Sequence, residues 1–96
     1  MLASTQPRMD TLVRLDSKRL YEIVGKQIRS VRMRRTISQR ALGKKTALSN
    51  TYICHVESGD YGVSLSHLYR IASALGVPPS ELLPDPADES VAARTV

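Results

Sequence analysis

Apolar residues recur along residues 17–34 at the spacing of a single helix face. Basic side chains fall largely off this apolar stripe, and Gly25 interrupts it at a cost of about 1 kcal/mol unless a neighbouring helix needs the close approach. The pattern predicts one long amphipathic helix with a buried stripe. The stripe consists of Leu20, Val24, Ile28 and Val31.

Three serines farther along the chain mark the starts of three shorter helices. Ser38, Ser49 and Ser64 are each preceded by an apolar residue and followed by another four positions later. A serine at this place accepts a hydrogen bond from a free backbone N–H, and the two apolar residues pack together across the cap. The flanking pairs are Ile37 and Leu42, Leu48 and Ile53, and Val63 and Leu68.

Glycine and proline mark where these helices end. Gly59 and Gly76 each follow a helical stretch and suit a left-handed C-terminal cap. The prolines at residues 78–79 then open a last short helix, because proline is tolerated in a first turn. The sequence therefore predicts an all-α fold, a compact domain of five helices with no strand.

The two ends of the chain differ from the centre in composition. We expect residues 1–15 to form a flexible N-terminal extension, with a short strand over residues 11–15 as the alternative. Residues 84–96 contain prolines, three acidic residues and few large apolar side chains, which is typical of a disordered acidic tail. The domain itself is expected over residues 16–83, and a length of 96 residues fits one domain.

Positive charge is concentrated in the centre of the chain. The net charge is +5, but residues 17–79 hold eleven Lys or Arg and only three acidic residues, whereas the remainder holds three and six. A basic centre favours a polyanionic partner such as nucleic acid or a membrane surface. A solvated basic face without a partner is the alternative.

Several classes of protein are disfavoured by the residues present. The single cysteine, Cys54, excludes an intrachain disulfide and fits a reducing compartment, and no apolar run is long enough to span a membrane. Without a signal-type segment, we expect the protein to be cytoplasmic.

Cys54, His55 and His67 do not have the spacing of a metal site, and no nucleophile and base form a pair. We expect neither an enzyme nor a cofactor, and a redox role for Cys54 is a minor alternative.

Residues 38–59 carry the most specific pattern in the chain. The matching features are the Ser38-Gln39 opening, Leu42, Ser49, Tyr52-Ile53 and Glu57-x-Gly59, with a further match over residues 71–77. In these features the chain resembles the lambda-repressor-like, or Cro-type (XRE), helix-turn-helix family. Within that family it is most similar to the controller proteins of restriction–modification systems. The resemblance implies a helix that enters the DNA major groove.

A recognition helix over residues 50–57 would turn Ile53 and Val56 to the core. Four polar residues then face outward: Asn50, Thr51, Cys54 and His55. Asn suits an adenine edge, Thr offers a hydroxyl and a methyl group, and His can donate to guanine or phosphate. In the family, the base-reading positions correspond to Ser49, Asn50, Thr51 and His55. We predict that Asn50, Thr51 and His55 read bases.

The resemblance also implies contacts around the recognition helix. It implies that Gln39 holds a phosphate and braces the first recognition residue, and that Arg32 and Glu57 form a structural ion pair. The other candidates for the DNA backbone are Ser38, Ser49, Ser64, Tyr52, Arg34, Arg35, Arg40, Lys44 and Lys45. Two positions depart from the family. Ala47 stands where it commonly has Gly, and Gly43 replaces the usual Ala.

These features predict a sequence-specific transcription regulator that binds double-stranded DNA. It would act as a homodimer on a two-fold symmetric operator and regulate its own gene. Its activity would be controlled by its own concentration or by a protein partner such as RNA polymerase or a toxin. Val77, Leu82 and Leu83 are candidates for the dimer surface, although they can equally fill the monomer core. The alternatives are an antitoxin that represses its own operon, with its toxin-binding segment at either end, and an adaptor that does not read DNA.

Overall fold

The computed structural model describes residues 5–84, with side chains from residue 17 onward. Its helices are α1 (Thr5–Arg34), α2 (Gln39–Thr46), α3 (Asn50–Ser58) and α4 (Leu65–Leu75), followed by the 3₁₀ turn η1 (Pro79–Leu82). The described residues contain no strand, so the all-α class is confirmed. The fifth element is a 3₁₀ turn and not an α-helix, because only four residues form it before the chain extends at Leu83. The predicted tail lies almost wholly outside the described residues.

The first helix is longer than the apolar pattern predicted. It begins at Thr5 and not near residue 17, so residues 5–16 are helical and do not form a strand. The flexibility of this extension stays a prediction. Residues 8–20 contain no glycine or proline and several good helix formers, and Pro7 falls in the first turn, where proline is tolerated. The apolar stripe located the buried part of α1 only, because its first half needs no core partner to be helical. Residues 1–4 lie outside the described part of the chain.

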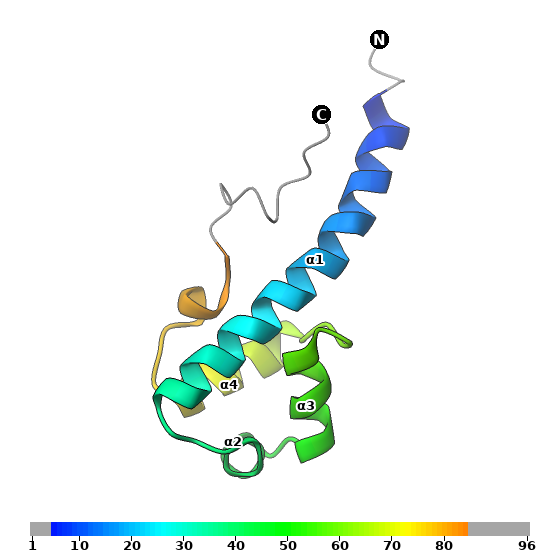
Figure 1. Ribbon diagram of the computed structural model, residues 1–96. Helices are drawn as coiled ribbons and strands as arrows, with labels where there is room; N and C mark the ends of the chain where they lie inside the picture. The colour runs from blue at the N-terminus through cyan, green and yellow to red at the C-terminus, as the bar shows by residue number, and fades with distance from the viewer. Residues whose placement is uncertain (1–4, 85–96) are drawn as a thin grey trace.

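The core lies between α1 and the three following helices (Figure 1). The second half of α1 runs across the domain, whereas its first half projects beyond the other helices. The predicted stripe is confirmed, with three of its members buried and Leu20 partly buried against them. Leu42, Ile53, Ile71 and Leu82 meet this stripe from the other elements. Each of the five elements therefore contributes to one core.

Helices α1 and α3 cross closely at Gly25. A Cβ atom at this position would clash with the Val56 carbonyl oxygen and would lie only 2.7 Å from the Glu57 carbonyl oxygen. No side chain fits in that space without moving a backbone. Gly25 is thus the point where α1 approaches the backbone of α3. Its missing side chain allows the short distance between the two helices.

All three serine caps are confirmed. The side chains of Ser38, Ser49 and Ser64 accept hydrogen bonds from backbone N–H groups three residues later, over 3.0, 3.0 and 3.2 Å. The two glycine stops are confirmed as well, since Gly59 and Gly76 both adopt the left-handed conformation. These caps fix the directions in which α2, α3 and α4 enter the domain.

The turn between α2 and α3 explains both departures from the family pattern. Ala47 is left-handed, with φ 60° and ψ 33°, a conformation that costs a non-glycine residue about 1–2 kcal/mol. Gly43 is buried, and a Cβ atom there would lie 2.7 Å from the Leu48 carbonyl oxygen. The chain after the turn thus folds back tightly over Gly43, and the missing side chain makes this possible.

Replacing Ala47 by glycine is expected to raise the free energy of unfolding by about 1 kcal/mol, because the left-handed strain is removed. Urea unfolding followed by circular dichroism measures this change. Ala41→Gly is the control, since Ala41 lies inside α2 and the same substitution should there lower stability by about 1 kcal/mol. Destabilisation by both changes would contradict the strain assigned to Ala47.

Candidate nucleic-acid interface

Helix α3 has a buried face and a polar outer face. Ile53, Val56 and Glu57 are buried, which confirms the predicted core-facing positions. Asn50 and Thr51 are exposed at the start of the helix, and Cys54 is exposed one turn later. The first turn of α3 therefore presents an amide and a hydroxyl to solvent, groups that can pair with base edges in the major groove. The roles of these residues in base reading stay predictions.

The end of α3 is held to α1 and α2 by a buried ion pair. The Arg32 guanidinium donates to Glu57 from Nε over 2.6 Å and from Nη2 over 3.0 Å, as expected. The remaining Arg32 nitrogen, Nη1, donates to the Ile37 carbonyl oxygen over 2.9 Å. Only 3% of the Glu57 side chain is exposed. This pair sets the orientation of α3 relative to the rest of the domain.

Gln39 joins the same network. Its amide nitrogen donates to Glu57 Oε1 over 3.0 Å, so the Gln39 side chain is anchored at the end of α3 and not at its first residue. The predicted brace of the first recognition residue is therefore not found, because the Gln39 amide contacts Glu57 instead. Contact of Gln39 with a phosphate stays a prediction, and the position of Gln39 in the first turn of α2 is compatible with it.

His55 is enclosed by the loop that follows α3. Its Nδ1 atom lies 3.1 Å from Asp60 Oδ2, and its ring stacks on Tyr61 with centroids 4.6 Å apart. Ser58 Oγ also donates to Asp60 Oδ2, over 3.0 Å. The backbone N–H groups of Asp60 and Tyr61 donate to the His55 carbonyl oxygen. The imidazole thus projects from the outer face of α3 in a fixed orientation.

Tyr52 is part of the structure around the first turns of α3 and α4. Its hydroxyl lies 2.9 Å from His67 Nδ1, and the two rings meet edge to face. The Tyr52 ring is partly buried against the core. Its hydroxyl was predicted to contact the DNA backbone, but here it links α3 to α4, so we assign it a structural role.

The predicted phosphate-contacting residues fall into two groups. Three basic residues of α2 are exposed, as are the three cap serines. Arg34, in contrast, pairs with Glu81 of η1 over 3.5 Å, and Arg35 lies beside Gly76 at the end of α4. The structure does not bring Arg34 and Arg35 to α3, because the end of α1 points them to η1 and α4. The candidates for the DNA backbone that remain are those of α2 and the caps: Ser38, Gln39, Arg40, Lys44, Lys45, Ser49 and Ser64.

Sequence reasoning missed two interactions near the interface. Arg70 of α4 donates to the Thr46 carbonyl oxygen over 2.9 Å and so caps the end of α2. Asp60 orients His55, as described above. Neither residue belongs to a motif. Asp60 follows the glycine stop of α3, and only its distance of five residues from His55 could have suggested a contact across that turn.

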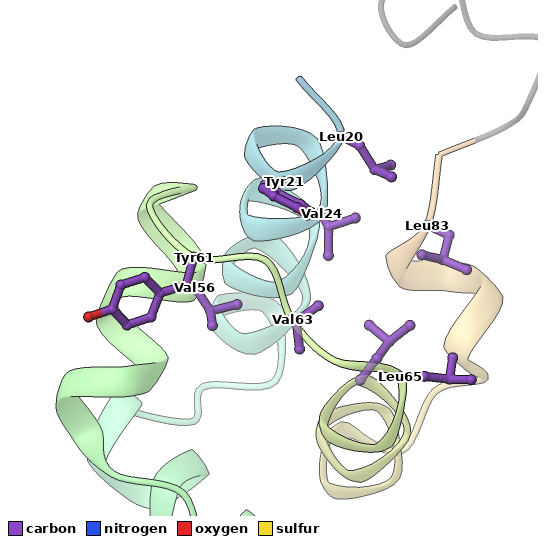
Figure 2. A pocket seen from close by; sticks show the side chains of 9 residues that line it. Leu20, Tyr21, Val24, Val56, Tyr61, Val63, Leu65 and Leu83 are labelled. Atoms are coloured by element: carbon purple, nitrogen blue, oxygen red, sulfur yellow. The ribbon is translucent and has the colours of Figure 1, made fainter. Parts of the chain in front are cut away.

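An apolar groove of about 250 Å³ is lined by residues of α1, α3 and α4 and of the segments after α3 and η1 (Figure 2), and by no residue of α2. Leu20, Tyr21 and Val24 of α1 form one wall, and Leu65 and Leu83 stand on the opposite side. Leu65 is 70% exposed although it lines this groove. Residues 49–51 are not among its lining residues. The groove thus leaves the first turn of α3 accessible.

Two of the three residues predicted for a dimer surface lie inside the monomer. Leu82 is fully buried and Val77 nearly so, whereas Leu83 is 42% exposed. The short η1 turn seats Leu82 between α1 and α4. Val77 and Leu82 therefore offer no surface to a second subunit, and only Leu83 remains a candidate, at the edge of the groove.

Within residues 5–84, no cluster of His, Cys, Asp and Glu side chains could hold a metal ion. The same part of the chain contains no helix that is both long and apolar enough to cross a membrane. The chemistry offered on the α3 side is that of hydrogen-bond donors, acceptors and positive charge, which is the chemistry of DNA contacts.

Two short capped helices joined by a tight turn, with the second bearing a polar outer face, define a helix-turn-helix protein. Residues 28–82 match the model of the helix-turn-helix family. This chain belongs to that family, and its resemblance to the XRE-type members is confirmed. The relatives found are named as control, repressor and controller proteins.

The chain is similar to several proteins whose names describe regulators. Control protein C.BamHI of Bacillus amyloliquefaciens is 37% identical over 62 residues, which cover 64% of this chain and 76% of that protein. The immunity repressor protein of Bacillus phage phi105 is 37% identical over 60 residues, covering 62% of this chain and 42% of the repressor. The restriction–modification controller C.AhdI from Aeromonas hydrophila superposes with a TM-score of 0.64 at 32% identity, covering 66% of this chain and 96% of the controller.

Proposed function

We propose that this protein is a sequence-specific transcription regulator that binds a two-fold symmetric operator as a homodimer and controls its own gene. The observation that carries the proposal is the outer face of α3, where Asn50 and Thr51 are exposed on a helix anchored by the Arg32–Glu57 pair. The similarity to a control protein, a restriction–modification controller and a phage repressor supports the same function. It gives no support to the antitoxin alternative.

In this proposal, Asn50, Thr51 and His55 contact base edges, while Gln39, the cap serines and the α2 cations contact the DNA backbone. Asn50 is the first residue of α3, and the first turn of a recognition helix reaches deepest toward the bases. The exposed cations of α2 attract phosphates without regard to sequence. The two sets of residues therefore have different expected effects on binding.

Asn50→Ala is expected to relax sequence preference. Loss of the amide should remove about 1–3 kcal/mol of discrimination at one base pair of each half-site, while binding to random DNA changes little. Lys44→Ala is the comparison, and it should weaken binding to cognate and random duplexes alike. Titrations of both variants with a selected duplex and a scrambled duplex at one salt concentration measure these effects.

Equal losses on the selected and scrambled duplexes for Asn50→Ala would contradict its role in base reading. Ser73→Ala is a suitable control, because Ser73 is exposed on α4 near its C-terminal end and is not among the proposed DNA contacts. This variant should bind both duplexes as the unaltered protein does.

We propose that a second copy of the chain covers the apolar groove. Four exposed large apolar side chains line the groove: Tyr21, Tyr61, Leu65 and Leu83. Pairing there would bury apolar surface that is costly to leave in water, and it would leave the first turns of both α3 helices free. A symmetric operator requires two recognition helices on one side of the dimer, and this surface permits it.

Leu65→Gln is expected to weaken self-association. Burial of a leucine contributes about 1.5–3 kcal/mol, so the monomer–dimer dissociation constant should rise at least about tenfold. Sedimentation velocity over a concentration series measures it. Met33→Gln is the matched control, since Met33 is also an exposed apolar residue but does not line the groove. Equal effects of the two changes, or a monomer at all concentrations, would contradict this surface.

A further inference from the structure

The orientation of His55 is determined by a residue that lies outside the helix-turn-helix motif. Nδ1 faces the Asp60 carboxylate at 3.1 Å, and Tyr61 covers one ring face. The Asp60 carboxylate is itself held by Ser58 Oγ. Nε2 is the ring nitrogen left for a ligand, because Nδ1 is engaged within the protein. The side chain is partly exposed on α3, one turn beyond Thr51.

The Asp60 carboxylate also determines which ring nitrogen carries the proton. Hydrogen bonds from His55 and then from Ser58 lower the pKa of Asp60 below its ordinary value, so this group is ionised near neutral pH. An ionised carboxylate only accepts hydrogen bonds, and Nδ1 must therefore be the donor. In the neutral imidazole the other nitrogen, Nε2, is then an acceptor.

We propose that Asp60 is a positioning residue for base recognition, which makes His55 Nε2 a hydrogen-bond acceptor toward the exocyclic amino group of adenine or cytosine. This inference rests on the proposed function, because it requires α3 to lie in the major groove. There, adenine N6 and cytosine N4 present donors, whereas guanine N7 and O6 and thymine O4 present acceptors. The neutral His55 ring thus favours two of the four bases.

Protonation of His55 reverses this preference. Both ring nitrogens of the imidazolium are donors, so Nε2 then pairs with guanine or with a phosphate and no longer accepts from an amino group. The added positive charge also favours any polyanion. The imidazolium therefore raises overall DNA affinity and shifts the preferred base toward guanine at this position.

Other charged and titratable groups surround the His55–Asp60 pair, and their effects on binding must be separated from its own. Tyr61 stacks on His55, and Tyr52 lies between Tyr61 and His67. From α1, three charged residues border Ser58: Glu22, Lys26 and Arg29. Exposed cations also lie on α2, which packs against α3: Arg40, Lys44 and Lys45. Of these groups, His67 is the other histidine of the sequence, so it needs a control of its own.

Two substitutions of Asp60 separate the effect of its negative charge from the effect of its hydrogen-bond acceptor. Asp60→Asn keeps an oxygen that can accept from Nδ1 but removes the negative charge, and Asp60→Ala removes both. Asp60 is exposed, so neither change disturbs the core. His67→Gln is the control for the second histidine. Each protein is used to select from a pool of random duplex DNA at about pH 8 and about pH 5.5, which bracket the histidine range.

At the higher pH, we expect the unaltered protein to select adenine or cytosine at one position of each half-site. Asp60→Asn should keep only part of this preference, because its amide can accept from Nδ1 or donate to it. Asp60→Ala should lose this preference by about fivefold to tenfold, the effect of one hydrogen bond. At the lower pH the preference of the unaltered protein should shift toward guanine, because both nitrogens of the imidazolium are donors. His67→Gln should behave as the unaltered protein.

A second measurement needs no DNA. The ¹⁵N shifts of the His55 ring in the free protein should report the Nδ1–H tautomer, and Asp60→Ala should abolish its predominance. A predominant Nε2–H tautomer in the unaltered protein, or base preferences that Asp60 substitutions and pH leave unchanged, would overturn the inference while leaving the proposed function intact. Failure of the unaltered protein to enrich any sequence at either pH would instead refute the proposed function.

Discussion

Glu57→Ala is expected to lower the free energy of unfolding by about 3–5 kcal/mol, the usual effect of removing one partner from a buried ion pair. The Glu57 carboxylate accepts three hydrogen bonds, two from Arg32 and one from Gln39. Its removal leaves the Arg32 charge in a site where only 10% of the arginine side chain is exposed. Because small domains are stable by only about 5–15 kcal/mol, much of the fold's stability would be lost. Urea unfolding followed by circular dichroism measures this loss.

The exposed ion pair between Arg34 and Glu81 provides the matched control. Its side chains are 58% and 47% exposed, and Glu81→Ala should change stability by less than about 1 kcal/mol. The double variant Arg32→Met with Glu57→Leu should recover most of the loss, because two apolar side chains leave no uncompensated charge. Similar effects of Glu57→Ala and Glu81→Ala would contradict the role of the buried pair in fixing α3.

Replacing Arg40, Lys44 and Lys45 together by glutamine is expected to have the largest effect on DNA affinity. Each lost phosphate contact lowers the slope of log affinity against log salt by about 0.9. Three contacts per subunit correspond to a loss on the order of a hundredfold or more at about 0.1 M salt. The loss should be the same for selected and scrambled duplexes, since these cations contact no bases in the proposal. Fluorescence anisotropy over a salt series measures both the affinity and its dependence on salt.

A triple glutamine variant at Lys18, Arg34 and Arg35 controls for net charge. It removes the same charge, but Arg34 and Arg35 lie toward η1 and α4 and not beside α3. The salt slope should change much less in this variant. If both triple variants lose the same affinity and the same slope, then binding depends on overall charge, and the assignment of α2 to the DNA backbone is wrong.

Local signals predicted most of the fold. A serine flanked by two apolar residues is sufficient to start a helix, because the cap and the contact across it need only neighbours in the sequence. Glycine in the left-handed conformation similarly ended two helices where expected. The Arg32–Glu57 pair joins residues 25 positions apart, and it was predicted from the family resemblance and not from any local pattern.

Features that depend on tertiary packing were not predictable in the same way. The apolar stripe gave no start for α1, because its first half lies beyond the core. Val77 and Leu82 have the apolar character of either a core or an interface, and only their burial distinguishes the two. The contact of Asp60 with His55 arises from the path of the chain after Gly59. Each of these depends on where the chain runs and not on residue type.

Selection of the purified protein on random duplex DNA, followed by sequencing of the enriched pool, tests the central claim most directly. The proposed function predicts a two-fold symmetric motif whose half-sites are centred about one helical turn apart, or a multiple of it, since each subunit of a dimer inserts one α3. A single asymmetric half-site would contradict the dimer, and no enrichment of any sequence would contradict sequence-specific recognition by α3.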